Sequence, residues 1–310
     1  MEKENNFLKI IKEICQELSI SFKTLSKDYV LMLEKDKIKK FIIGYKFDLL
    51  THAEGLIFDD KYAMYDLLNN LNISVVKHYI IYHENNLNSY AINCKGIKYL
   101  KEIYKLCNHN LVIKINNGTC GIGIYKTNNL NTLIDIYNKL IDKNFSLCLC
   151  PFYDIEYEYR AIVLDGKIKL LYKKIKPVVI GDGVKSIKEL LMNFNYEYFK
   201  NYDKENKDDV LIKGEIFEYD WKFNLSRGAI SSNNISLEEK EKIEEIVNDL
   251  KSKIKLSFCS VDVIKTKDKK FYVMEINSGV MMENYIVQHE NGYDLAKNIY
   301  KEAILKMFKD

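Results

Sequence analysis

Arginine is almost absent from this sequence, although basic residues are common. Of the 47 lysines and arginines in 310 residues, only Arg160 and Arg227 are arginine. Lysine cannot reproduce the planar, bidentate donor fork of a guanidinium. We therefore interpret the two arginines as candidates for sites that need this fork, with retention by chance as the alternative.

Hallmarks of several other protein classes are also missing. No apolar run reaches the length of a membrane span, and the polar residues 1–6 do not resemble a secretory signal. The formal net charge of +3 is close to balance and gives no reason to expect a nucleic acid as partner. These absences predict a cytoplasmic protein that acts without a membrane or a nucleic acid.

The reactive side chains form few patterns by themselves. The seven cysteines lack metal-ligand spacing, and Cys148 and Cys150 lie in an apolar run typical of a core strand. No nucleophile elbow is present, which argues against a covalent enzyme intermediate. The histidines form no ligand pattern, and we expect each to be structural or exposed: His52, His78, His83, His109 and His289.

The composition is that of an ordinary globular protein with mixed secondary structure. Hydrophobic residues make up 47% and charged residues 29% of the chain, and its 310 residues are enough for two or three compact units. Asp59 and Asp60 predict the start of a helix over 61–71. Residues 145–174 are typical of strands, broken by a turn at 165–166. Helices and strands alternate without strict regularity, which predicts small α+β lobes.

The most informative segment is a predicted hairpin of strands 257–264 and 271–277, joined by a polar turn. If the turn is centred between Asp268 and Lys269, Asp262 pairs directly with Glu275. Side chains alternate across a strand, so Asn277 then lies on the same face as these two carboxylates.

Two like charges at directly paired positions destabilise a sheet, because their Cβ atoms are about 4.5–5.5 Å apart. Phe258, Ile264 and Val273 are expected on the same face, so this face is partly apolar rather than fully solvated. Two carboxylates and an amide oxygen that converge there suit a divalent cation such as Mg²⁺ or Mn²⁺. The alternative is an edge hairpin whose charges point to water.

A second pattern combines a lysine with a glycine-bearing loop. Lys114 lies at the end of a predicted strand, and the loop 116–123 that follows contains three glycines. Backbone N–H groups in such a loop can form an anion-binding concavity, to which the lysine adds a charge. The spacing is neither that of a P-loop nor G-x-G-x-x-G, so a plain hairpin loop stays open as the alternative.

Each arginine lies in a polar segment. Glu156, Glu158 and Arg160 share one face of a predicted strand, either as part of a site or as a surface charge ladder. Arg227 lies in the segment 220–228, which has no core periodicity and therefore predicts a binding loop.

Taken in order, these segments resemble the ATP-grasp superfamily, and within it the carboxylate–amine ligases of the glutathione synthetase, ribosomal S6 glutamate ligase and cyanophycin synthetase branch. The resemblance covers about residues 59–284 and includes a Gly-Asp-Gly segment at 181–190 that is similar to cyanophycin synthetases. It implies an α+β ATP-grasp fold, in which two α+β lobes grip ATP, preceded by a small α/β lobe. The implied boundaries are 1–75 for the N-terminal lobe, 76–150 for the small ATP-grasp lobe and 151–310 for the large lobe with the metal site.

The resemblance also implies roles for the matching residues. The nucleotide-binding residues would be Lys61, Lys114, Gly118, Thr119, Gly121, Cys150, Phe152, Glu158, Lys222 and Asn224. The metal ligands would be Asp262, Glu275 and Asn277. The catalytic residues would be Arg227, which holds the substrate carboxylate, and Lys174 or its neighbour Lys173, which orients phosphate. Two positions depart from the family pattern, because Lys114 precedes isoleucine instead of proline and Lys222 stands where arginine is common.

The function that the resemblance implies is ATP-dependent ligation. A substrate carboxylate would attack the γ-phosphorus of ATP, and an amine would displace phosphate from the acyl phosphate, giving an amide or peptide bond and ADP. The expected cofactors are ATP and two Mg²⁺ ions, with Mn²⁺ as a substitute. The expected partners are small carboxylates and amines of amino-acid or peptide type, and a homodimer is allowed. The alternatives are an ATP-grasp kinase with a hydroxyl acceptor and a nucleotide-binding regulator, the latter disfavoured by the intact metal triad.

Overall fold

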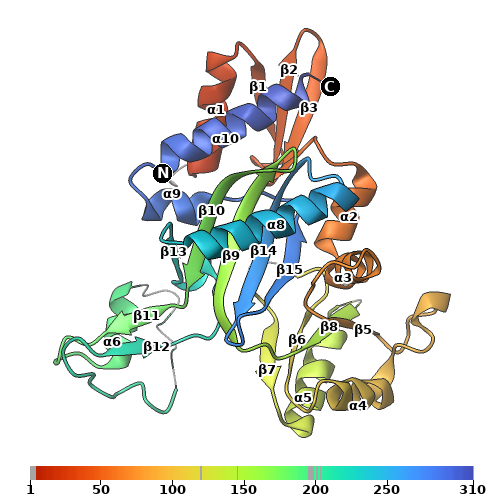
Figure 1. Ribbon diagram of the computed structural model, residues 1–310, viewed down its shortest axis with the longest axis vertical. Coiled ribbons are helices and arrows are strands. Elements are labelled where there is room, and N and C mark those ends of the chain that lie inside the picture. The colour runs from red at the N-terminus through yellow and green to blue at the C-terminus, as the bar shows by residue number, and fades with distance from the viewer. Residues whose placement is uncertain are drawn as a thin grey trace. The chain divides into compact units, whose positions relative to one another are not determined.

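The computed structural model describes residues 5–118, 121–144, 146–194, 199, 202 and 204–309, and it combines helices with antiparallel sheets (Figure 1). The chain divides into two compact units. The first comprises residues 1–173 and 233–310, and the second comprises residues 174–232. The α+β class predicted from the sequence is confirmed, whereas the three lobe boundaries stay a prediction.

The first unit opens with a helix and a four-stranded antiparallel sheet. The helix α1 spans Asn6–Glu17, and its buried face includes Ile10 and Ile14. The late helix α10 (Gly292–Met307) packs against α1, as Figure 1 shows. The strands follow in sheet order as β1 (Ser21–Leu25), β2 (Val30–Lys35), β3 (Ile38–Ile43) and β4 (Lys46–Phe47).

Two consecutive helices connect this sheet to the rest of the unit. The first, α2, spans His52–Asp59, and the second, α3, spans Lys61–Asn70. Asp60 caps α3, because its Oδ1 accepts a hydrogen bond from the N–H of Ala63 at 2.8 Å. The helix start predicted at this acidic pair is therefore confirmed.

A second antiparallel sheet carries the lysine and the glycine-bearing loop. Its strands, in sheet order, are β5 (Tyr79–Tyr82), β8 (Ser146–Pro151), β6 (Leu111–Ile115) and β7 (Ile124–Thr127). The helices α4 (Gly96–Leu106) and α5 (Leu130–Ile141) pack on this sheet, with a short η1 turn at Ser89–Ala91. Leu100 of α4 and Leu133 of α5 join Ile113 of β6 in one buried cluster. This core fixes the strand that ends at Lys114.

The third sheet of the unit carries the predicted metal triad. Its strands, in sheet order, are β10 (Lys167–Ile175), β9 (Ile155–Leu164), β14 (Phe258–Thr266) and β15 (Phe271–Asn277). The helix α8 (Leu237–Lys253) lies across the sheet (Figure 1) and buries Ile243 and Val247 against Val261 and Val263 of β14. The alternate side chains of β14, including Asp262, therefore lie on the opposite face. A short helix, α9 (Glu283–Gln288), leads from β15 to α10.

The second unit is small and has its own core. Its elements are β11 (Val178–Ile180), α6 (Ile187–Phe194), β12 (Ile216–Glu218), η2 (Leu225–Arg227) and β13 (Ile230–Ser232). Val179, Leu191 and Tyr219 lie in a cluster of buried side chains. Gly181, the first glycine of the Gly-Asp-Gly segment, has no room for a side chain, because a Cβ there would lie 2.2 Å from the carbonyl oxygen of Ile212.

Candidate active site

The two carboxylates of the predicted triad lie side by side. In the antiparallel pair of β14 and β15, Asp262 pairs with Glu275, and Ser260 pairs with Asn277. Asn277 Nδ2 lies 3.4 Å from Glu275 Oε1, so the amide is on the same face. The predicted pairing of Asp262 with Glu275 is therefore confirmed.

One part of the predicted face is wrong. A β-bulge interrupts the pairing after Asp262, so that Val263 pairs with Val273. Val273 is fully buried in the core cluster under α8 with Val263, on the face opposite the triad. The extra residue of the bulge turns Glu275 toward Asp262 while Val273 stays in the core, and such re-aiming of one side chain is a common effect of bulges.

Arg160 holds the carboxylate of Asp262. The two residues pair directly between β9 and β14. The Nε of Arg160 donates to Asp262 Oδ1 at 2.7 Å, and its second guanidinium nitrogen donates to Oδ2 at 2.6 Å. The Asp262 side chain is only 1% exposed, so the fork compensates a charge that burial would otherwise make costly.

The donors of the triad fit a hard divalent cation. Asp262 and Glu275 offer carboxylate oxygens and Asn277 an amide oxygen, which are the ligands that Mg²⁺ prefers. Within the described ranges, no three His, Cys, Asp or Glu side chains are grouped so as to hold a metal. The triad contains only two such residues, and a further oxygen would come from a bound phosphate.

Lys114 lies on β6 as a buried cation. It is 7% exposed, and its ammonium makes no hydrogen bond to any residue that the structure describes. Burial acts to lower the pKa of Lys114, but the neighbouring thiols of Cys150 and Cys148, followed by the carboxylates of Glu275 and Glu158, outweigh it and raise the pKa. The ammonium is therefore charged and close to one carboxylate of the triad, as a phosphate-binding lysine would be.

The base of the glycine-bearing loop is fixed to the start of α3. Asn116 is 1% exposed, and its Nδ2 donates to Asp60 Oδ2 at 2.7 Å. Its Oδ1 accepts from the N–H of Tyr62 at 3.1 Å. One amide side chain thus forms hydrogen bonds with both the capping residue and a backbone N–H in the first turn of α3.

Lys61 binds the same loop through its side chain. Its Nζ donates to the carbonyl oxygens of Gly118 at 2.5 Å and Asn116 at 3.3 Å. Burial lowers the pKa of Lys61, Lys114 lowers it further, and Glu275 opposes both. Lys61 is therefore a loop anchor that lies in the electrostatic field of the triad.

The glycines of this loop fold back over Ile115. A Cβ on Gly118 would lie 2.9 Å from Ile115 Cβ, and one on Gly123, whose φ is +67°, would lie 2.6 Å from Ile115 Cδ1. Gly121 has a φ of +70°, which also favours glycine. Thr119, the remaining loop residue predicted to bind nucleotide, lies outside the described residues.

The predicted nucleotide residues near the end of β8 are largely buried. Cys150 is 6% exposed and pairs with Val112 of β6. The N–H of Phe152 donates to the carbonyl oxygen of Asn110 at 3.0 Å. Glu158 is 7% exposed and lies two residues before Arg160 on β9, on the same face. The first unit thus brings Glu158 and Lys114 near the triad.

The second unit presents a separate cationic loop. Arg227 Nε donates to Asp220 Oδ2 at 2.8 Å, and Asp220 Oδ1 accepts from the N–H of Lys222 at 3.2 Å. Asn224 begins the η2 turn, since its carbonyl accepts from the N–H of Arg227 at 2.9 Å. Burial lowers the pKa of Lys222, and the neighbouring Arg227 adds to this effect. Lys174 is 4% exposed in the same unit.

Sequence reasoning assigned no role to Asn116 or Asp220, and it predicted Asp60 only as part of a helix start and His78 only as structural or exposed. Asp220 orients Arg227, and an acidic residue seven positions before a rare arginine was the available signal. His78 is 2% exposed, and burial, with help from Lys114 and Lys61, holds its pKa well below the usual value.

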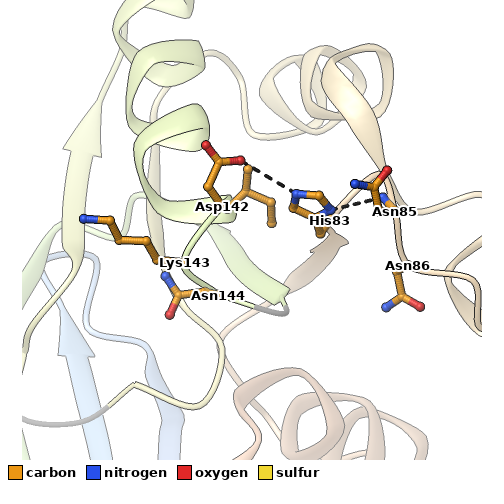
Figure 2. Close-up of a pocket in the computed structure, with 7 residues that line it drawn as sticks. His83, Asn85, Asn86, Asp142, Lys143 and Asn144 are labelled. Carbon is orange, nitrogen blue, oxygen red and sulfur yellow. Dashed lines mark hydrogen bonds and ion pairs between the residues drawn. The ribbon is translucent and has the colours of Figure 1, made fainter.

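A hollow elsewhere contains none of the predicted site residues. It has a volume of about 380 Å³ and lies between the ends of β5 and α5 (Figure 2). His83 Nε2 lies 3.7 Å from Asp142 Oδ1 at its rim, as Figure 2 shows. We assign no function to this hollow.

Comparison with protein families and with known proteins finds similarity over part of the chain. Residues 212–303, which include the triad and the Arg227 loop, match the model of the RimK-like ATP-grasp domain. Two glutathione biosynthesis bifunctional proteins GshAB, from Streptococcus agalactiae serotypes V and III, are 31% identical over 161 residues. This match covers 51% of the chain but only 20% of either relative.

Comparison with solved structures extends the likeness to most of the chain. A bifunctional glutathione synthetase from Pasteurella multocida superposes with a TM-score of 0.54 at 16% identity, over 96% of this chain and 44% of that one. A D-alanine–D-alanine ligase from Bacillus anthracis gives a TM-score of 0.51 at 16% identity, over 81% of this chain and 66% of that one. Among the described residues, no helix is both long and apolar enough to cross a membrane.

Proposed function

We propose that the chain is a member of the ATP-grasp superfamily and an ATP-dependent ligase that joins a substrate carboxylate to an amine. The observation that supports this most is the side-by-side placement of Asp262, Glu275 and Asn277, with the buried Lys114 in their electrostatic field. This arrangement suits the polyphosphate of a nucleotide and a divalent cation.

The first unit would bind the phosphates. Asp262, Glu275 and Asn277 would hold Mg²⁺, which neutralises phosphate charge when it is bound. Lys114 supplies a charged ammonium without a competing hydrogen bond among the described residues. The loop whose base is anchored by Lys61 and Asn116 would cover the phosphates and exclude water, which otherwise hydrolyses an acyl phosphate. Two Mg²⁺ ions and the nucleotide roles of Gly118, Gly121, Cys150, Phe152 and Glu158 are part of this proposal.

The reaction proceeds in two balanced steps. A substrate carboxylate oxygen attacks the γ-phosphorus of ATP, the bond to the β-phosphate oxygen breaks, and ADP leaves. An amine then attacks the carbonyl carbon of the acyl phosphate, the bond to the phosphate oxygen breaks, and phosphate leaves with one amine proton as the amide forms. Arg227, whose guanidinium is oriented by Asp220, would hold the carboxylate and stabilise the tetrahedral oxyanion. Lys174 would orient phosphate, while Lys222 and Asn224 would approach the nucleotide.

The proposed substrates are amino acids or peptides. The similar proteins named above act in glutathione biosynthesis and on D-alanine, and all of them are longer than the matched part of this chain. A cytoplasmic location and a homodimer remain predictions from the sequence.

The test is a trapping assay. The protein is incubated with ATP, Mg²⁺, hydroxylamine and a panel of amino acids and dipeptides. Formation of an acyl hydroxamate together with ADP and phosphate supports the ligase. A phosphorylated substrate without free phosphate would instead identify a kinase and would refute the proposal.

A further inference from the structure

Three charged residues form a row across three neighbouring strands. Arg160 of β9 pairs with Asp262 of β14, which pairs in turn with Glu275 of β15. Asp262 therefore has a cation on one side and a second carboxylate on the other. Without the cation, the two carboxylates would repel each other across the sheet.

The contact between Arg160 and Asp262 fixes the orientation of the Asp262 carboxylate. Both oxygens of the carboxylate accept a hydrogen bond from the guanidinium, at 2.7 and 2.6 Å. A guanidinium that binds both oxygens fixes the plane of the carboxylate as well as its position. Because the Asp262 side chain is 1% exposed, the fork fixes the orientation of a carboxylate that is closely surrounded by protein.

The choice of arginine is informative in this chain. Only two of its 47 basic residues are arginine, and this is one of them. A lysine at position 160 would supply the same charge but only a point donor, which cannot hold both oxygens of a carboxylate in one plane. Position 160 is thus occupied by the residue type that supplies both a positive charge and two donors in a fixed plane.

We propose that Arg160 is a positioning residue, which holds the Asp262 carboxylate in the orientation that binds a nucleotide-bound divalent cation. This inference rests on the proposed function, because it assigns Arg160 to the same metal site. Groups that orient metal ligands typically contribute 10–100-fold to metal affinity. The fork should therefore strengthen the coupling between Mg²⁺ and nucleotide, and not the binding of nucleotide alone.

The test measures binding rather than turnover. The affinity for ADP is determined by calorimetry in excess Mg²⁺ and again in EDTA, for the wild type and for Arg160→Lys. The ratio of the two affinities gives the coupling between metal and nucleotide. We expect R160K to reduce this ratio by about tenfold or more, with the affinity in EDTA unchanged. The control is Glu239→Gln, which breaks a different ion pair of β14, Lys265 Nζ to Glu239 Oε1 at 2.8 Å, and should leave the ratio at its wild-type value.

The outcomes separate the two proposals. A wild type that binds no ADP under either condition refutes the proposed function. If the wild type shows the coupling, an unchanged ratio in R160K overturns the positioning role, because charge alone is then sufficient. A higher ratio overturns it as well, since Arg160 would then compete with the metal. If R160K does not fold, Arg160→Gln is measured instead, and it must show the same loss.

Discussion

The two hydrogen bonds by which the Asn116 side chain joins Asp60 and Tyr62, called the Asn116 clamp below, allow a prediction of how much unfolding free energy they contribute. Asn116→Ala removes the bond from Nδ2 to the Asp60 carboxylate, which is 2.7 Å long, and the bond from the N–H of Tyr62, which is 3.1 Å long. A bond to a charged group contributes about 1.5–3 kcal/mol and a neutral bond about 0.5–1.5 kcal/mol. The variant should therefore lose about 2–4 kcal/mol of unfolding free energy.

Asn116→Asp gives a sharper form of the same test. It keeps the acceptor for Tyr62 but places a carboxylate oxygen where the amide donated to Asp60. At pH 7.5 the two carboxylates repel, whereas at pH 5 one of them can hold a proton and donate it. N116D should therefore be more stable relative to the wild type at pH 5 than at pH 7.5, and N116A should show no such trend.

The assay is urea unfolding at 25 °C followed by circular dichroism, at both pH values, for the wild type and the two variants. An N116A protein within about 0.5 kcal/mol of the wild type would show that the clamp contributes little. An N116D protein with the same relative stability at both pH values would show that the two side chains do not meet.

Three further predictions address the proposed chemistry and the buried charges. Glu275→Gln should lower ATP turnover at least a hundredfold, or about 2.7 kcal/mol, while its circular dichroism spectrum stays that of the wild type; a fully active variant would refute the metal assignment. Burial holds the pKa of His78 well below its usual value in the folded protein. As the pH falls through about 6.5, the imidazole therefore takes up a proton only in the unfolded chain. The free energy of unfolding is highest above that pH and decreases below it. The wild type should thus lose about 1.4 kcal/mol relative to His78→Asn between pH 7.5 and 5.5 in urea titrations, and equal losses would contradict this account. Asp220→Asn should lower kcat/KM for the carboxylate about tenfold, with KM for ATP unchanged in steady-state kinetics, because it removes the partner that orients Arg227.

Local patterns were sufficient to predict the core of the candidate site. The helix cap at Asp60 depends on neighbouring residues, and the pairing of Asp262 with Glu275 depends on strand period and a short turn. Both are confirmed because no distant part of the chain is needed to specify them. The position of Val273 was mispredicted, since a bulge shifts the side-chain alternation and leaves no simple mark in the sequence.

Contacts between residues far apart in the sequence could not be predicted from such local patterns. Arg160 and Asp262 are 102 positions apart, and their contact depends on the register between β9 and β14. Asn116 and Asp60 are 56 positions apart and belong to a loop and a helix cap. The sequence showed that each residue type was suited to a polar contact, but the partner is selected only when the sheets assemble.

The packing of α10 on α1 has a consequence for synthesis on the ribosome. Lys297 donates to Glu13 at 2.8 Å across a separation of 284 positions, and Phe7 packs edge-on against the buried ring of Tyr300. At about 5–20 residues per second, α10 is made roughly 15–60 s after α1. The apolar face of α1 therefore stays uncovered until the residues between the two helices, and α10 itself, have been translated. Any pause in translation between the two helices prolongs the exposure of this face.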